Sequence, residues 1–279
     1  MSINFTELKD TLLQRKSTRT YGDKYPSEEQ TQQIRDYIEM LNQIEQPFNR
    51  KVKLVLQTED FYGIRTLGFI TGCKYWIYGI VPKDDPQSLK QFGYLFQLLI
   101  LKCTQLNLAT VWLGGTFTAS SFTAMQYDSS KEYIPCVSPV GIDGKGMELL
   151  GKLFGGRKRK NWETMFFNQT FETPIFQGKQ PEPYTEWMME SIRFAPSATN
   201  SQPWRVVFDG KNIHVFGLNK IFKEVDLGIT CGNIHVMLMN SNFNPKLVEL
   251  PEAEIREKVK APKDLVYILS FISDRACEN

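Results

Sequence analysis

The chain has 279 residues and a formal net charge of +2, and 42% of its residues are hydrophobic while 23% are charged. This composition is that of an ordinary soluble globule, and so small a net charge argues against nucleic acid or an acidic membrane as a partner. No apolar run approaches the length of a bilayer span, and no secretory signal opens the chain. We therefore expect a cytoplasmic protein.

Five cysteines and two histidines are spread along the chain without a Cys-x-x-Cys or Cys/His ligand spacing. A structural zinc site and a disulfide framework are therefore not expected. The sequence also lacks the glycine patterns of a Rossmann nucleotide site and of a P-loop. A cofactor site in this chain has to be built from other motifs.

Apolar spacing predicts a helix from Phe5 to about Arg15, with Thr6 as its cap. Ser27 and Gln30 form a capping-box pattern at the start of a second helix, which extends to about residue 41. The other elements expected in the first half are strands over 51–56 and 74–81, a long core helix over 92–106, and strands over 110–113 and 133–140.

A segment rich in Pro, Gly, Gln and Thr over 168–183 reads as a linker, so we divide the chain into halves over 1–167 and 184–279. The second half is expected to begin with a helix over 185–194. Strands over 204–208 and 213–216 are joined by Asp209-Gly210, a strong hairpin signal. A helix over 229–240 and a strand over 265–271 complete this half.

The two halves repeat the same order of elements. Phe92-Gly93 aligns with Leu227-Gly228 at an offset of 135 residues, and the helix that follows then aligns without a gap. Gln46-Pro47-Phe48 likewise matches Gln202-Pro203-Trp204, each between a helix and a strand, although the first half is two residues shorter before this string. This agreement favours an internal duplication over chance similarity.

The run Arg15-Lys16-Ser17-Thr18-Arg19 supplies two guanidinium groups, an ammonium group and two hydroxyls. In an extended turn, Arg15, Ser17 and Arg19 point the same way, and guanidinium groups bind phosphate bidentately. An exposed basic helix end is the alternative interpretation of this run.

Two further segments carry short or absent side chains next to expected strands. Pro196 to Asn200 follows a helix, and its small residues would let the backbone approach a flat ring, although a plain connecting turn has the same composition. Gly114-Gly115 follows a short apolar strand and permits positive φ and bare backbone N–H groups, although a turn is again the simpler interpretation.

Taken together, these motifs resemble the nitroreductase family of FMN-dependent oxidoreductases. The family's opening motif matches Arg15, Ser17, Arg19 and Tyr21. Its most specific string, Ala-Pro-Ser-x-x-Asn-x-Gln-Pro-Trp, lies in the other half of the chain. Further matches are the strings at 108–115 and 139–141 and the basic stretch at 157–160.

The resemblance implies an α+β fold in which two tandem, diverged nitroreductase-like copies pack as an intramolecular pseudo-dimer. Ordinary family members are homodimers in which one subunit supplies the Arg/Ser motif and its partner supplies the Pro-Ser loop. In this chain the first half would supply the former and the second half the latter, so one composite site is complete. The opposite site would lack both its loop and its Arg/Ser motif.

The same resemblance implies the role of each site residue. Arg15, Arg157 and Arg159 would hold the FMN phosphate with Ser17, and Lys16 belongs to the same motif. Arg19 would lie near the pyrimidine edge of the flavin. The ring would be covered by Pro196, Ser197, Ala198 and Asn200, and the backbone N–H groups of Gly114 and Gly115 would face it. Two departures from the pattern are an unrecognisable contact helix between Gln57 and Gly72 and a glycine-rich insert before the basic stretch.

These interpretations predict an FMN-dependent oxidoreductase that takes hydride from NADH or NADPH and reduces a small-molecule acceptor such as a nitroaromatic or quinone. No protein acid or base stands out, so positioning on the flavin would carry the reaction. A flavin-binding protein without turnover, for storage or sensing, is the alternative. A fused pseudo-dimer needs no partner to complete its pocket, so both a monomer and a homodimer fit the sequence.

Overall fold

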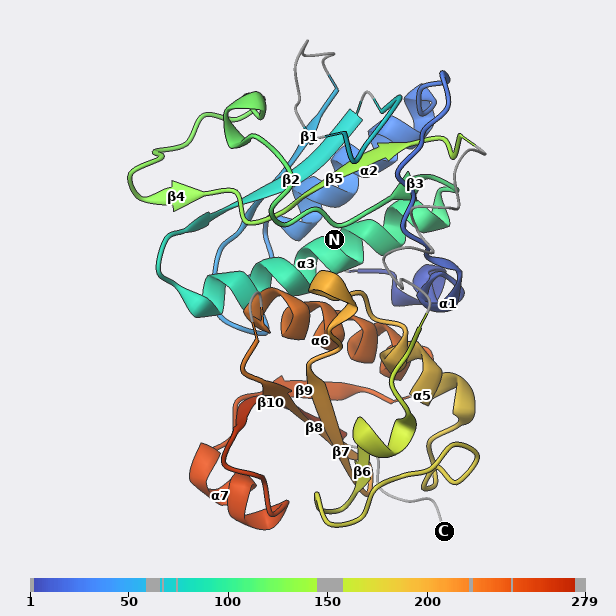
Figure 1. Ribbon diagram of the computed structural model, residues 1–279, viewed down its shortest axis with the longest axis vertical. Helices are drawn as coiled ribbons and strands as arrows, with labels where there is room; N and C mark the ends of the chain where they lie inside the picture. Colours follow the sequence, from blue (N-terminus) through green and yellow to red (C-terminus); the bar gives the residue numbers. More distant parts are fainter. Residues whose placement is uncertain are drawn as a thin grey trace.

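The computed structural model describes residues 3–58, 66, 68–73, 75–144, 158–220, 223–241 and 243–273. Two five-stranded sheets lie on opposite sides of a central pair of helices, α3 (Pro86–Gln105) and α6 (Lys223–Met239) (Figure 1). The fold is the α+β arrangement expected from the sequence. Within the described ranges, no helix is both long and apolar enough to cross a bilayer.

The first sheet has the strand order β1-β2-β5-β3, and its pairs are antiparallel, with β4 added to β2. Its elements, with the helices that precede and follow them, are η1 (Phe5–Leu8), α1 (Thr11–Gln14), α2 (Glu28–Leu41), β1 (Lys53–Gln57), β2 (Tyr75–Pro82), β3 (Ala109–Thr110), η2 (Ala119–Ser121), β4 (Glu132–Tyr133) and β5 (Val137–Gly141).

Most of the expected elements in this half are confirmed, and three differ in detail, among them the strand expected over 110–113, which is only the two-residue β3. The capping box at the start of α2 is present, because Ser27 and Gln30 exchange hydrogen bonds between side chain and backbone. The single N-terminal helix is instead two short helices, η1 and α1, separated by a turn at 9–10. The strand expected over 133–140 is broken into β4 and β5 around Pro135, where proline cannot donate to a ladder.

The second sheet has the order β6-β7-β8-β10-β9, and one of its strands joins it from a distant part of the chain. β6 (Phe166–Asn168) pairs in parallel with β7 (Trp204–Asp209), whereas the other pairs are antiparallel. The remaining elements are η3 (Trp162–Thr164), α5 (Glu186–Arg193), η4 (Ala198–Asn200), β8 (Asn212–Leu218), β9 (Pro245–Val248), α7 (Glu252–Lys258) and β10 (Leu265–Ser273). The expected hairpin at Asp209-Gly210 is confirmed, and Gly210 adopts φ +59° there.

Residues 158–168, called the crossing arm below, therefore belong to the second sheet in space. The chain leaves the first sheet at β5 and reaches the second sheet at β6 before α5 begins (Figure 1). No local sequence pattern indicates this pairing, because the partners are about forty residues apart and lie on either side of a helix. Its consequence is that residues 158–160 run directly beside the loop that precedes β7.

The central helices touch at two glycines that the sequence repeat pairs with each other. A Cβ added to Gly93 would lie 2.3 Å from the Val225 carbonyl oxygen, and one added to Gly228 would lie 2.1 Å from the Lys90 carbonyl oxygen. Only glycine permits so close an approach of two helix backbones. Residues 93 and 228, which the 135-residue offset aligns, therefore meet at one crossing.

We expect Gly228→Ala to destabilise the protein by about 1–3 kcal/mol, because the new methyl group cannot fit against the backbone of α3. Gly232→Ala, one turn further along α6, is the matched control. Its Cβ would lie 3.3 Å from the Tyr94 carbonyl oxygen, and the gain in helix propensity of about 1 kcal/mol offsets this tighter contact. Urea unfolding measures both variants, and equal destabilisation would contradict the close crossing.

Candidate functional site

The Arg15–Arg19 motif lies in an extended segment beside β3 of the first sheet. The Thr18 amide donates to the Thr110 carbonyl oxygen at 2.9 Å, and Ser17 forms a parallel bridge with Thr110. The Tyr21 hydroxyl donates back to the Thr18 carbonyl oxygen at 2.8 Å and fixes the end of the segment. The backbone of the motif is thus held in the extended form that the sequence predicted.

Arg15 stands where this segment leaves α1, and it is half-buried. Its Nη1 atom is shielded from solvent and has no hydrogen-bond partner among the described residues. Burial, together with the nearby Arg159 cation, lowers the pKa of Arg15 to about 10. Two guanidinium groups therefore lie close enough to repel each other, and no carboxylate among the described residues pairs with Arg15; an anion bound there would offset this cost.

Arg159 reaches the same region from the crossing arm and connects it with the second half. Its Nη1 donates to Asn200 Oδ1 at 2.8 Å, and its guanidinium lies 5.1 Å over the Phe194 ring. Asn200 in turn donates from Nδ2 to the Lys158 carbonyl oxygen at 2.7 Å. Burial lowers the pKa of Arg159, and the Arg193 cation contributes to the shift. Arg15, Arg159 and Asn200 are thus brought to one place from three separate segments.

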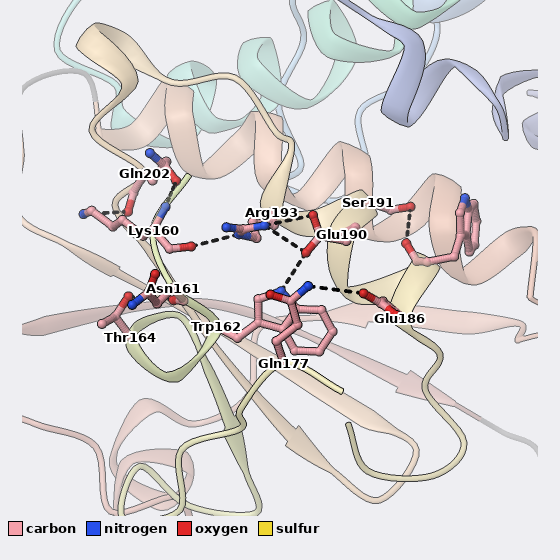
Figure 2. Close-up of polar contacts among 11 residues, drawn as sticks. Lys160, Asn161, Trp162, Thr164, Gln177, Glu186, Glu190, Ser191, Arg193 and Gln202 are labelled. Atoms are coloured by element: carbon pink, nitrogen blue, oxygen red, sulfur yellow. Dashed lines mark hydrogen bonds and ion pairs between the residues drawn. The ribbon is translucent and has the colours of Figure 1, made fainter. Parts of the chain in front are cut away.

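The backbone on both sides of Arg159 is clamped by side chains of the second half (Figure 2). Gln202 accepts from the Lys160 amide at 2.8 Å and donates to the Lys158 carbonyl oxygen at 3.3 Å. Arg193 Nε donates to the Lys160 carbonyl oxygen at 2.8 Å. These bonds fix the direction in which the Arg159 side chain leaves the arm.

A second layer of contacts holds Arg193 itself. Its Nη1 lies 3.0 Å from both carboxylate oxygens of Glu190 on α5, and Trp162 Nε1 donates to Glu190 Oε1 at 2.6 Å (Figure 2). Both charged side chains are largely buried, so this ion pair is shielded from solvent screening. The arm is therefore attached to α5 at two successive points.

The loop over 196–202, called the 196–202 loop below, has an unusual backbone. Thr199, Asn200 and Gln202 have φ values of 50°, 56° and 47°, in the left-handed region that non-glycine residues rarely adopt. Ser197 Oγ accepts from the Gln202 amide at 2.9 Å and closes the loop. Such strained conformations persist only where neighbouring contacts hold them, and they cluster at functional sites.

Asp226, in the first turn of α6, holds this loop conformation through hydrogen bonds. Its Oδ1 accepts from the Ala198 amide at 2.9 Å, and its Oδ2 accepts from the Ser201 hydroxyl at 3.4 Å. The side chain is buried, and burial raises its pKa to about 7. Among the described residues, no basic side chain pairs with it, so its bonds go to the loop.

The other predicted site residues have contacts of their own. Lys16 forms an ion pair with Asp143, and burial lowers the pKa of Arg19. Pro196, Ser197 and Ala198 are half-buried on the 196–202 loop. Arg157 lies outside the described residues.

Gly114 and Gly115 follow the segment that pairs with Ser17 through Thr110. Gly115 is exposed, and a Cβ built on it would have open space on all sides within 4 Å. The positive φ that these glycines permit is not used, because the described glycines with positive φ are Gly68, Gly72, Gly178 and Gly210. Their part in a ring-binding site stays a prediction, and Gly115 offers an exposed backbone for it.

Three polar residues of the site were missed from the sequence: Arg193, Gln202 and Asp226. Gln202 is named in the sequence analysis only as part of the Gln-Pro-Trp string, yet it is almost fully buried and bonded to the arm. The 135-residue offset aligns Asp226 with Gln91, but only the structure shows that both side chains are buried. Nothing in the local sequence marks Arg193.

Comparison with known proteins places this geometry in context. The family model described as "Putative TM nitroreductase" matches residues 7–239. A structure described as a "putative nitroreductase" from Thermotoga maritima shares the fold, with a TM-score of 0.63 at 16% identity, over 99% of this chain and 97% of that one. No curated protein matches the sequence significantly.

Other solved structures match about half of the chain. A nitroreductase with bound FMN from Bacteroides fragilis has a TM-score of 0.41 at 12% identity, covering 51% of this chain and 91% of its own. A "Putative NADH Oxidase" from Clostridium acetobutylicum has a TM-score of 0.40 at 16% identity, covering 49% of this chain and 89% of its own.

Proposed function

The chain belongs to the nitroreductase family, and from this premise we propose that it is an FMN-dependent oxidoreductase using NADH or NADPH. The observation that carries the proposal is the buried Nη1 of Arg15, which has no hydrogen-bond partner among the described residues and lies close to the Arg159 cation. An anionic ligand at this point would satisfy the donor and offset the repulsion between the two cations.

The proposed anion is the FMN phosphate. Guanidinium groups bind phosphate oxygens with paired, charge-assisted N–H donors, which are stronger than neutral hydrogen bonds. Arg15 and Arg159 would provide them, with Ser17 adding a hydroxyl and Arg157 extending the basic stretch. The residues present therefore fit a phosphorylated flavin better than an uncharged one.

The ring system of the cofactor would lie between the two halves. The 196–202 loop offers small side chains that allow close approach, and Asn200 joins this loop to Arg159. On the other side, Gly114 and Gly115 present backbone without side chains. Arg19 is partly buried on the Arg/Ser motif, and its charge would stabilise negative charge on the reduced ring.

When bound, FMN would supply hydride transfer between a nicotinamide and a small-molecule acceptor such as a nitroaromatic or quinone. The chain's own residues would bind and orient the reactants and exclude water, and holding reactants in contact is worth about 7–11 kcal/mol of a reaction barrier. No side chain is proposed as a general acid or base. Because both halves of the site come from one chain, a second copy is not needed to complete it.

Turnover can be tested with the purified, FMN-loaded protein. We expect NADH or NADPH to bleach the flavin absorbance under anaerobic conditions, and a nitrofuran or quinone to restore it. If the flavin binds but stays oxidised with both NADH and NADPH, the proposed enzymatic activity is wrong, and a storage or sensing protein is favoured. A chain that binds no flavin would contradict the cofactor as well.

Arg15→Ala tests the phosphate contact directly. The lost charge-assisted bond is worth roughly 1.5–3 kcal/mol, so we expect FMN affinity to fall about 10- to 150-fold. Arg35→Ala is the control, because Arg35 is an exposed arginine on α2 that contacts Thr58 instead. Fluorescence quenching of FMN measures the affinity of both variants. Equal affinity in the Arg15→Ala variant and the wild type would show that Arg15 does not bind the phosphate.

A further inference from the structure

Asp226 and Gln91 occupy equivalent positions in the two halves. They lie at the same 135-residue offset as Gly93 and Gly228, Gln91 in α3 and Asp226 in the first turn of α6. Gln91 is 0% exposed and Asp226 is 2% exposed, so both side chains must find their hydrogen-bond partners within the protein. Asp226 bonds to the loop before the Gln-Pro-aromatic string of its half, whereas Gln91 bonds to Ile44 in the corresponding loop and to both ends of the string itself.

Gln91 holds the shorter loop of the first half mainly through carbonyl oxygens. Its Nε2 donates to the Gln46 carbonyl oxygen at 2.8 Å and to the Ile44 carbonyl oxygen at 3.3 Å. Its Oε1 accepts from the Phe48 amide at 3.1 Å. An amide is needed here, because only an amide both donates and accepts.

The groups that face Asp226 are hydrogen-bond donors, whereas those that face Gln91 are mainly carbonyl acceptors. The 196–202 loop presents it with two donors, the Ala198 amide and the Ser201 hydroxyl. An ionised carboxylate accepts from both and donates to neither. The two residues between these contacts, Thr199 and Asn200, have left-handed backbone conformations, so the carboxylate fixes both ends of the strained turn.

We propose that Asp226 is a positioning residue that holds the 196–202 loop in the shape that covers the cofactor. The carboxylate does not need to touch the cofactor for this role. It sets the position of Asn200, which is bonded to the proposed phosphate-binding Arg159. The predicted effect on FMN rests on the proposed function, whereas the effect on the loop does not.

The test compares Asp226→Ala, Asp226→Asn and Gln91→Ala by FMN affinity and by amide hydrogen exchange of the 196–202 segment without FMN. Asp226→Ala should weaken FMN binding about tenfold or more and accelerate exchange in the loop. Asp226→Asn should stay within about threefold of the wild type, because its Oδ1 can accept from Ala198 and its Nδ2 can donate to Ser201. Gln91→Ala should leave FMN affinity within about twofold, although it also removes buried hydrogen bonds.

Two results would overturn the proposal: unchanged loop exchange in Asp226→Ala, or equal weakening of FMN binding by Asp226→Ala and Gln91→Ala. The second would show a general loss of stability. If Asp226→Ala does not fold, Ser201→Ala removes one of the two bonds from the loop side and should still accelerate exchange there. If the wild type binds no FMN, the proposed function fails, while faster exchange in Asp226→Ala still supports the positioning role.

Discussion

The candidate site depends on two partly buried guanidinium groups, those of Arg15 and Arg159, that lie close enough to repel each other. Arg15 comes from the segment after α1, and Arg159 comes from the crossing arm. Folding does not favour such a pair by itself, because burial and like charge both oppose it. Other contacts hold Arg159 in place, and an anion bound beside the two arginines would neutralise their charges.

Those other contacts come from the way the chain passes between its two sheets. The crossing arm adds β6 to the second sheet, and Gln202 and Arg193 fix the backbone on either side of Arg159. Meanwhile α3 and α6 cross at Gly93 and Gly228, which brings the sheets of the two halves onto a common central pair of helices. Residues that are about 140 positions apart thus face the same region.

Much of the fold followed from local patterns in the sequence. The capping box at Ser27, the Asp209-Gly210 hairpin and the periodicity of α3 each have a physical cause within a few residues. The crossing arm has no such signal, because a three-residue parallel strand is defined by its distant partner. Similarly, the sequence could indicate Arg15 and Asn200 as candidates, but the burial that gives Gln202 and Asp226 their roles exists only in the folded chain.

The loops before the two Gln-Pro-aromatic strings differ in length and in the side chains that hold them. The loop before Gln46 is shorter and is bonded to Gln91 on α3, whereas the longer loop before Gln202 is bonded to Asp226 on α6. This asymmetry gives the central claim, a single composite flavin site per chain. Calorimetric titration of the apoprotein with FMN tests it most directly: binding should saturate at one equivalent per chain, and saturation at two equivalents, or no binding at all, would contradict it.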